Sequence, residues 1–295
     1  MEVFHARPRP GMIVAYSLAV LALGGAARAQ DSARLLATSG VSEVEGAGGG
    51  GLATWALITG YGSRDAIGAN MHGTFVGLSD FGLGSVGASV GLYDRLELSY
   101  AHDWFDTSAA GGRLGLGRGY QFNLDVAGAK LRLLGNAVYD QDTWLPEISV
   151  GTQFKAADSH AVLKAIGAGS PDGVDFYVAA TKLFLAQSLL VNATVRATKA
   201  NQFGILGFGG DRDDGYSAEF EGSAALLLTR RLAIGAEFRT RPDNLAFAHE
   251  GDAYDLFGAF FLNKHLSATL AYVDLGAIAR QGDQKGYYIS LQAGF

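Results

Sequence analysis

Apolar and polar residues alternate along most of this chain with a period of two, and this pattern constrains the fold more than any other feature. At the C-terminus every second side chain is apolar: Tyr287, Ile289, Leu291, Ala293 and Phe295. Successive side chains of a strand point to opposite faces, so this segment has one apolar face. The same alternation recurs in 147–154, 174–181 and 232–239. Half-buried strands repeated in this way predict an all-β fold.

Turn residues divide the pattern into twelve expected strands. Their ranges are 66–76, 84–92, 95–104, 120–133, 144–155, 174–184, 189–198, 216–228, 232–240, 253–262, 266–275 and 286–295. Tight reversals, as at 229–231, alternate with long polar or Gly-rich connections, as at 199–215, although 135–142 is long for a tight reversal. This arrangement is typical of outer-membrane barrels. We therefore predict a closed antiparallel transmembrane β-barrel of about twelve strands, with a soluble periplasmic β-sandwich as the main alternative.

The composition agrees with a barrel. Glycine accounts for 42 of the 295 residues, about twice the usual ~7%. The chain beyond its first thirty residues contains no apolar run long enough to form a membrane helix. It contains 0 cysteines, which excludes disulfides, thiolate metal sites and a lipid-modified N-terminal cysteine.

The N-terminus has the features of an export signal. Arg7 and Arg9 precede an apolar run from Met12 to Leu23, and Ala27-Arg28-Ala29 matches a cleavage site. We predict a signal peptide over 1–29 that is removed on export. Its loss takes away three arginines and one glutamate, so the net charge changes from −6 to −8. A chain this acidic is not expected to bind nucleic acid.

Residues 30–61 form a Gly-rich N-terminal segment, and the barrel is expected over 62–295. Four consecutive glycines, Gly48 to Gly51, would let the backbone pack closely against a wall. This segment could be a plug inside the barrel or an extra strand. We favour the plug, because a thirteenth strand would make the strand number odd.

The stretch GVSEVEGAGGGGLATWALITGYGSRDAIGA, Gly40 to Ala69, resembles the opening signature of an uncharacterised domain-of-unknown-function family of proteobacterial exported proteins. That signature has a proline before the tryptophan, where this chain has Thr54. The resemblance would cover nearly the whole mature chain and implies an envelope location. It implies no activity and no catalytic residues.

Charged residues are expected to line the lumen, because a charge facing lipid at mid-membrane costs roughly 2–4 kcal/mol. The candidates are Asp125, Lys130, Arg132, Glu147, Lys155, Asp175, Arg196, Glu219, Glu221, Glu237, Arg239, Arg241 and Asp255. Two interpretations compete. A hydrated pore would use these charges to orient solutes, whereas a filled barrel would use them as salt bridges. We expect the narrow hydrated pore.

Two predictions of register follow. An odd number of positions separates Asp125 from Lys130, so a regular strand would place them on opposite faces. Placing both inside requires a β-bulge, which we expect near Ala127-Gly128, with Leu131 and Leu133 turned outward. In the hairpin around Thr229-Arg230-Arg231, the turn should place Glu221 opposite Arg239 and Glu219 opposite Arg241. Opposite charges facing across a ladder stabilise it modestly.

No motif for catalysis, a cofactor or a metal stands out. Asp158, Ser159 and His160 are adjacent in one loop, but a catalytic triad needs side chains that converge from separate elements. We predict a non-enzymatic, porin-like passive channel for small polar solutes. A structural or adhesion barrel acting through its long loops is the second hypothesis, and a barrel hydrolase is the third. The expected partners are outer-membrane lipid and the barrel-assembly machinery, which would recognise the strand ending at Phe295.

Overall fold

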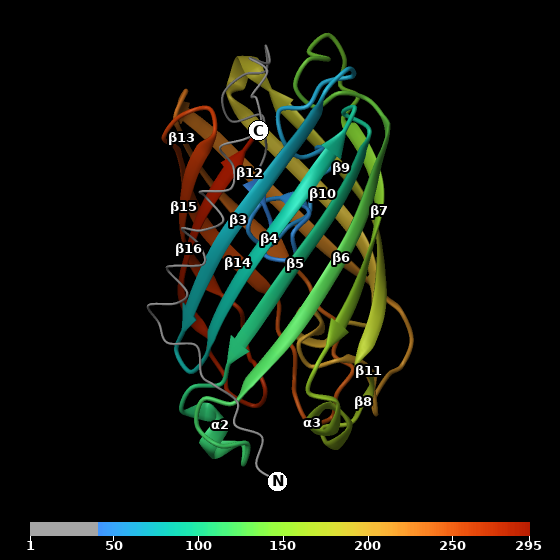
Figure 1. The fold of residues 1–295 in the computed structure, drawn as a ribbon, viewed down its shortest axis with the longest axis vertical. Helices are drawn as coiled ribbons and strands as arrows, with labels where there is room; N and C mark the ends of the chain where they lie inside the picture. Colours follow the sequence, from blue (N-terminus) through green and yellow to red (C-terminus); the bar gives the residue numbers. More distant parts are fainter. Residues whose placement is uncertain (1–40) are drawn as a thin grey trace.

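A computed structural model describes residues 41–295, so the predicted signal peptide and residues 30–40 lie outside the described residues. The described chain forms a closed barrel of twelve antiparallel strands (Figure 1). They are β3 (Ile67–Leu78), β4 (Gly82–Leu92), β5 (Leu96–Asp106), β6 (Gln121–Leu134), β7 (Glu147–Ala157), β9 (Asp172–Phe184), β10 (Leu189–Thr198), β12 (Ser217–Thr229), β13 (Leu232–Arg239), β14 (Ala253–Phe261), β15 (Leu266–Asp274) and β16 (Lys285–Gly294). Pairing of β16 with β3 closes the barrel, so the predicted fold class is confirmed.

The connections divide between two rims. One rim carries both ends of the strand series and every short reversal except the turn 79–81 between β3 and β4, which lies on the opposite rim. The other carries the long connections, which contain α2 (Ala110–Arg113), α3 (His160–Ala165), η3 (Asn201–Gly204) and a small sheet of β8 (Ala168–Ser170) with β11 (Phe208–Gly210) (Figure 1). The short-turn rim also holds η2 (Leu185–Gln187). Among residues 41–295, no helix is long and apolar enough to cross a membrane.

Side chains on the barrel wall alternate as the sequence predicts. On β12, Phe220 and Leu226 are exposed on the outside, whereas Glu221 and Ser223 are buried inside. An apolar outer face and a charged inner face place the costly charges away from lipid.

The register of β6 corrects one prediction. Its ladder with β5 runs unbroken from Gln121 to Leu131, so there is no bulge at Ala127-Gly128; the pairing with β7 shifts only between Arg132 and Leu134. Phe122, Leu124 and Val126 face inward instead, because this end of the lumen is apolar. Lys130 is therefore inward without any change of face, and Leu131 and Leu133 are outward as expected.

Asp125 consequently lies on the outer surface and does not line the lumen. Its Oδ1 accepts hydrogen bonds from the Tyr100 hydroxyl at 2.6 Å and pairs with His102 Nδ1 at 2.9 Å. These partners offset the cost of an outward carboxylate. The predicted inward position of Asp125 is wrong, because the polar residues at the start of β6 lie on the outer face of the barrel and the apolar residues lie on the inner face.

Residues 41–61 lie inside the barrel, where Figure 1 shows them in blue. We call this stretch the internal segment. Two short strands, β1 (Val41–Ser42) and β2 (Gly48–Gly49), pair within it and are separate from the barrel ladder. The segment returns to the short-turn rim, where the Tyr61 amide donates to the Phe295 carbonyl at 2.8 Å.

Candidate functional site

The centre of the lumen holds a buried cluster of charges. Apart from Asp125, the predicted lumen residues have inward side chains, and all of these except the half-buried Glu219 are almost completely buried. All of them except Arg241, which follows β13, come from strands that are distant in sequence but share the inner face of one closed sheet. Alternation along each strand is what turns them inward.

Three cations and three carboxylates form the core of this cluster. Lys155 Nζ lies 2.7 Å from Asp175 Oδ2, and Arg196 Nη1 lies 3.4 Å from the same oxygen. Arg196 Nε lies 2.5 Å from Glu221 Oε1, and Arg239 Nε lies 3.5 Å from that oxygen.

The third carboxylate belongs to the internal segment. Glu45 Oε2 pairs with Arg239 Nη1 at 2.8 Å, and Glu45 Oε1 pairs with Lys155 Nζ. Glu45 thus connects β7 with β13 across the lumen.

Other wall charges hold the backbone of the internal segment. Glu97 accepts from the amides of Gly48 at 2.9 Å and Thr59 at 2.8 Å. Lys130 Nζ lies 3.1 Å from Glu97 Oε1 and donates to the Gly48 carbonyl at 2.9 Å. Glu237 accepts from the Leu52 amide at 2.8 Å. The wall therefore satisfies backbone groups that would otherwise be buried without partners.

Two of the predicted hairpin contacts can be compared directly. Glu221 pairs with Arg239 across β12 and β13, as predicted. The predicted pair of Glu219 and Arg241 is wrong, because Arg241 lies beyond the end of β13. Arg241 donates instead to the Leu275 carbonyl at 2.6 Å, and Glu219 accepts from the Thr240 hydroxyl.

Sequence reasoning missed Glu45 and Glu97 as members of the cluster. Glu97 alternates with Leu96 and Leu98, so its inward direction was readable. Glu43 and Glu45 are the two charges within an otherwise small and apolar stretch, 40–61. That isolated pair was the available signal, but their partners could not be found from local pattern.

Apolar side chains close the lumen toward the long connections. Phe105, Phe122 and Leu124 on the wall share one buried cluster with loop residues such as Phe203 and Leu245. The Phe203 ring also lies 4.5 Å from the Arg239 guanidinium carbon, so this apolar cap rests directly on the charged cluster.

A carboxyl group is buried in the same cap. Burial raises the pKa of Glu250 to about 7, although Arg241 Nη1, 3.7 Å away, opposes this change.

The short-turn end is closed by a second apolar cluster. Trp55 of the internal segment packs with Ala137, Val138 and Leu183, and its Nε1 donates to Ser223 Oγ at 2.9 Å. Ala137 and Val138 belong to the connection 135–146, which is the unusually long one on this rim. Its extra length is used to reach over the end of the internal segment.

Wall side chains that face the internal segment are almost completely buried, as Glu221, Asp255 and Tyr288 show. A cavity of about 20 Å³ lies beside Gly51, Asp255 and Tyr288. That is enough for roughly one water molecule. The lumen in this conformation is therefore packed, in contrast to the hydrated pore that we expected.

A family model described as a protein of unknown function, DUF3034, matches residues 38–292. The chain belongs to the DUF3034 family. The family resemblance expected from the opening signature, to an uncharacterised domain-of-unknown-function family, is thus confirmed. No curated protein matches the chain.

Solved structures of outer-membrane barrels are similar to this DUF3034 chain. A KdgM porin in complex with disordered oligogalacturonate is 12% identical, with a TM-score of 0.49, over 77% of this chain and 99% of that chain. An outer membrane channel from Pseudomonas putida F1 is 14% identical, with a TM-score of 0.43, over 77% and 93%. Outer membrane phospholipase A from Escherichia coli is 8% identical, with a TM-score of 0.41, over 80% and 94%.

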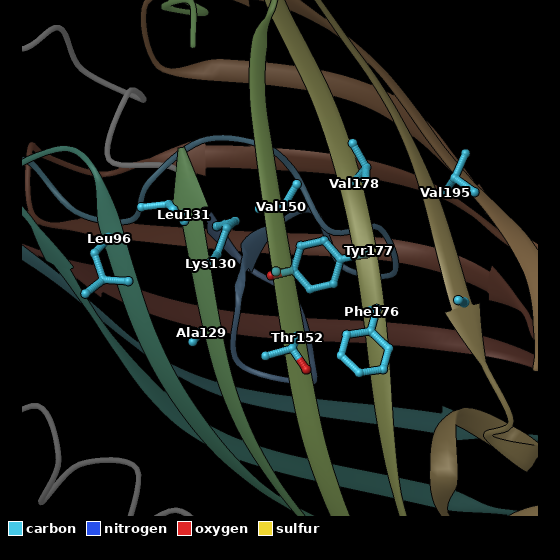
Figure 2. Close-up of a pocket in the computed structure, with 12 residues that line it drawn as sticks. Leu96, Ala129, Lys130, Leu131, Val150, Thr152, Phe176, Tyr177, Val178 and Val195 are labelled. Carbon is cyan, nitrogen blue, oxygen red and sulfur yellow. The ribbon is translucent and has the colours of Figure 1, made fainter. Parts of the chain in front are cut away.

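The outer face of the DUF3034 barrel is apolar, as expected for an outer-membrane protein. Figure 2 shows a shallow groove of about 630 Å³ on this face, between β5 and β10. Exposed apolar side chains such as Leu131, Phe176 and Val195 line it. The polar lining residues Lys130 and Tyr177 are buried, so the exposed lining is mostly apolar.

The loop residues that invited a hydrolase interpretation do not form a relay from Ser159 to His160. Ser159 Oγ donates to Asp158 Oδ1 at 2.9 Å and accepts from the Tyr120 hydroxyl at 3.1 Å. Within residues 41–295, no group of three or more His, Asp or Glu side chains could hold a metal ion.

Proposed function

We propose that this DUF3034 protein is an outer-membrane channel for small polar solutes that is closed at rest by its internal segment. The observation that carries the proposal is the position of Glu45. This carboxylate completes the ion pairs of Lys155 and Arg239, two wall residues that would line the lumen if the segment moved.

Stability alone is a poor reason for so many buried charges. Replacing a buried ion pair by well-packed apolar residues is often neutral or stabilising. A barrel that is always filled could therefore use an apolar interior, as this chain does at its long-connection end. Charges at the centre are better explained if they meet water in a second, open state.

A second candidate function is a permanently closed barrel that acts through its long loops. The apolar cap favours it, because Phe203 and Leu245 are packed as tightly as core residues. However, Val44 and Leu52 of the internal segment belong to the same cluster. Displacement of the segment would therefore remove part of the support of the cap.

The proposal is tested by deleting residues 43–58. Ser42 Oγ donates to Asn70 Oδ1 at 3.1 Å, and Ser89 Oγ donates to Thr59 Oγ1 at 3.0 Å. Asn70 and Ser89 are paired across β3 and β4, so the joined ends already lie close together.

The measurement is single-channel conductance in planar bilayers, with heat-modifiable gel migration to show that each barrel is folded. The deletion should conduct in discrete steps at voltages where the wild type stays closed. A second variant also lacks residues 202–206 of the cap, where the Asn201 amide already donates to the Gly207 carbonyl at 2.9 Å. If both folded variants fail to conduct, the loop-based function replaces the channel.

A further inference from the structure

We propose that the position of the Glu45 carboxylate is a binding site for the carboxylate of a transported organic anion. This inference rests on the proposed channel function, because the site becomes vacant only when the internal segment moves. In the closed state, Glu45 would then occupy the site as an internal substitute for the solute.

The balance of charge at the centre supports this assignment. Lys155, Arg196 and Arg239 contribute three positive charges, and the wall supplies Asp175 and Glu221 to pair with them. Glu45 supplies the third negative charge. Within this group of six, its departure removes the carboxylate that both Lys155 and Arg239 contact, and a carboxylate from solution could take its place.

The geometry is that of an anion receptor. Lys155 lies on β7 and Arg239 on β13. Lys155 contacts one oxygen of the Glu45 carboxylate, and Arg239 contacts the other. Hydrogen bonds to a charged partner are shorter and stronger than neutral ones. Arg239 is further held by groups that stay when the segment leaves, the Phe203 ring at 4.5 Å and Glu221 Oε1 at 3.5 Å.

Glu43 provides an internal comparison. It lies two residues from Glu45 and is equally buried, but its carboxylate accepts from Thr54 Oγ1 at 2.9 Å and Gln153 Nε2 at 3.0 Å. These hydrogen-bond donors are neutral. Because only Glu45 of these two carboxylates contacts cations directly, we assign the anion site to the position of Glu45.

The neighbouring wall carboxylates define the rest of the solute. Glu237 and Glu221 accept from the amides of Leu52 at 2.8 Å and Thr54 at 2.8 Å. Without the segment, they would accept from hydroxyl or amino groups of a solute. The expected class is therefore a small carboxylate that also carries hydrogen-bond donors.

The test is calorimetric titration of the folded deletion variant lacking residues 43–58 with gluconate, and with sorbitol as the uncharged match. Gluconate should bind and sorbitol should not. In the same background, Arg239→Gln should weaken gluconate binding roughly tenfold or more, because a charged hydrogen bond is lost. Lys285→Gln removes a half-exposed cation at the start of β16 and should leave binding unchanged.

Conductance separates this inference from the channel proposal. A deletion variant that conducts but neither binds gluconate nor prefers anions would overturn the carboxylate site alone. Gluconate binding through Arg239, with no conductance either in this variant or in the one that also lacks residues 202–206 of the cap, would keep the site and overturn the channel. Equal binding by the Arg239→Gln and Lys285→Gln variants would also reject the site.

Discussion

At the scale of the residue, burial decides what the lumen charges do. Glu221 and Arg239 face one another as their strand positions predict, but both side chains are almost fully excluded from solvent. A hydrated pair would be screened and worth little. In this packed environment, Arg239 compensates two carboxylates, those of Glu221 and Glu45.

Substitution of Arg239 by Ala should therefore cost about 3–5 kcal/mol of unfolding free energy, since it leaves buried carboxylates uncompensated. Denaturant unfolding in detergent measures the change. Arg231→Ala, at an exposed position in the same hairpin, should change stability by no more than about 0.5 kcal/mol. A loss below about 1 kcal/mol for Arg239→Ala would mean that the pair is hydrated after all.

At the scale of the element, the sequence pattern predicted the positions of the strands. It did not predict which side chains meet inside the barrel. All twelve barrel strands agree with the period-two segments to within a few residues. The face of β6 was misassigned because polarity at its start was taken to mark the lumen, whereas Phe122 and Leu124 fill it. Alternation identifies two faces, but it cannot say which one is inside when the interior is partly apolar.

The internal segment depends on glycine for its close approach to the wall. A Cβ added at Gly50 would lie 1.7 Å from Glu237 Oε1, and that carboxylate is held by Ser223 and the Leu52 amide. Gly50→Ala should therefore lower the unfolding free energy by about 1–3 kcal/mol.

The matched control is Gly258→Ala on β14, where an added Cβ meets no heavy atom within 4 Å. Denaturant unfolding of both variants in the same detergent compares them. Equal effects of the two substitutions would show that Gly50 is not in close contact with the wall.

At the scale of the whole molecule, the barrel is a closed wall around the internal segment, residues 41–61. The contact that distinguishes a filled lumen from a hydrated one joins Glu45 to Lys155, which are 110 residues apart. The same inward charges suit either state, so no local pattern could choose between them. The sequence showed 135–142 as long for a tight reversal, but the role of the observed connection 135–146 in covering Trp55 required the assembled barrel.

We expect the internal segment to stay packed inside the barrel as part of the folded protein. Hydrogen–deuterium exchange of the wild-type protein over residues 44–57 tests it most directly, because exchange reports local opening. The amides of Gly48, Leu52 and Thr54 donate to buried wall carboxylates, so they should exchange as slowly as those of the barrel strands. Exchange as fast as that of the exposed loop 211–216 would contradict the account.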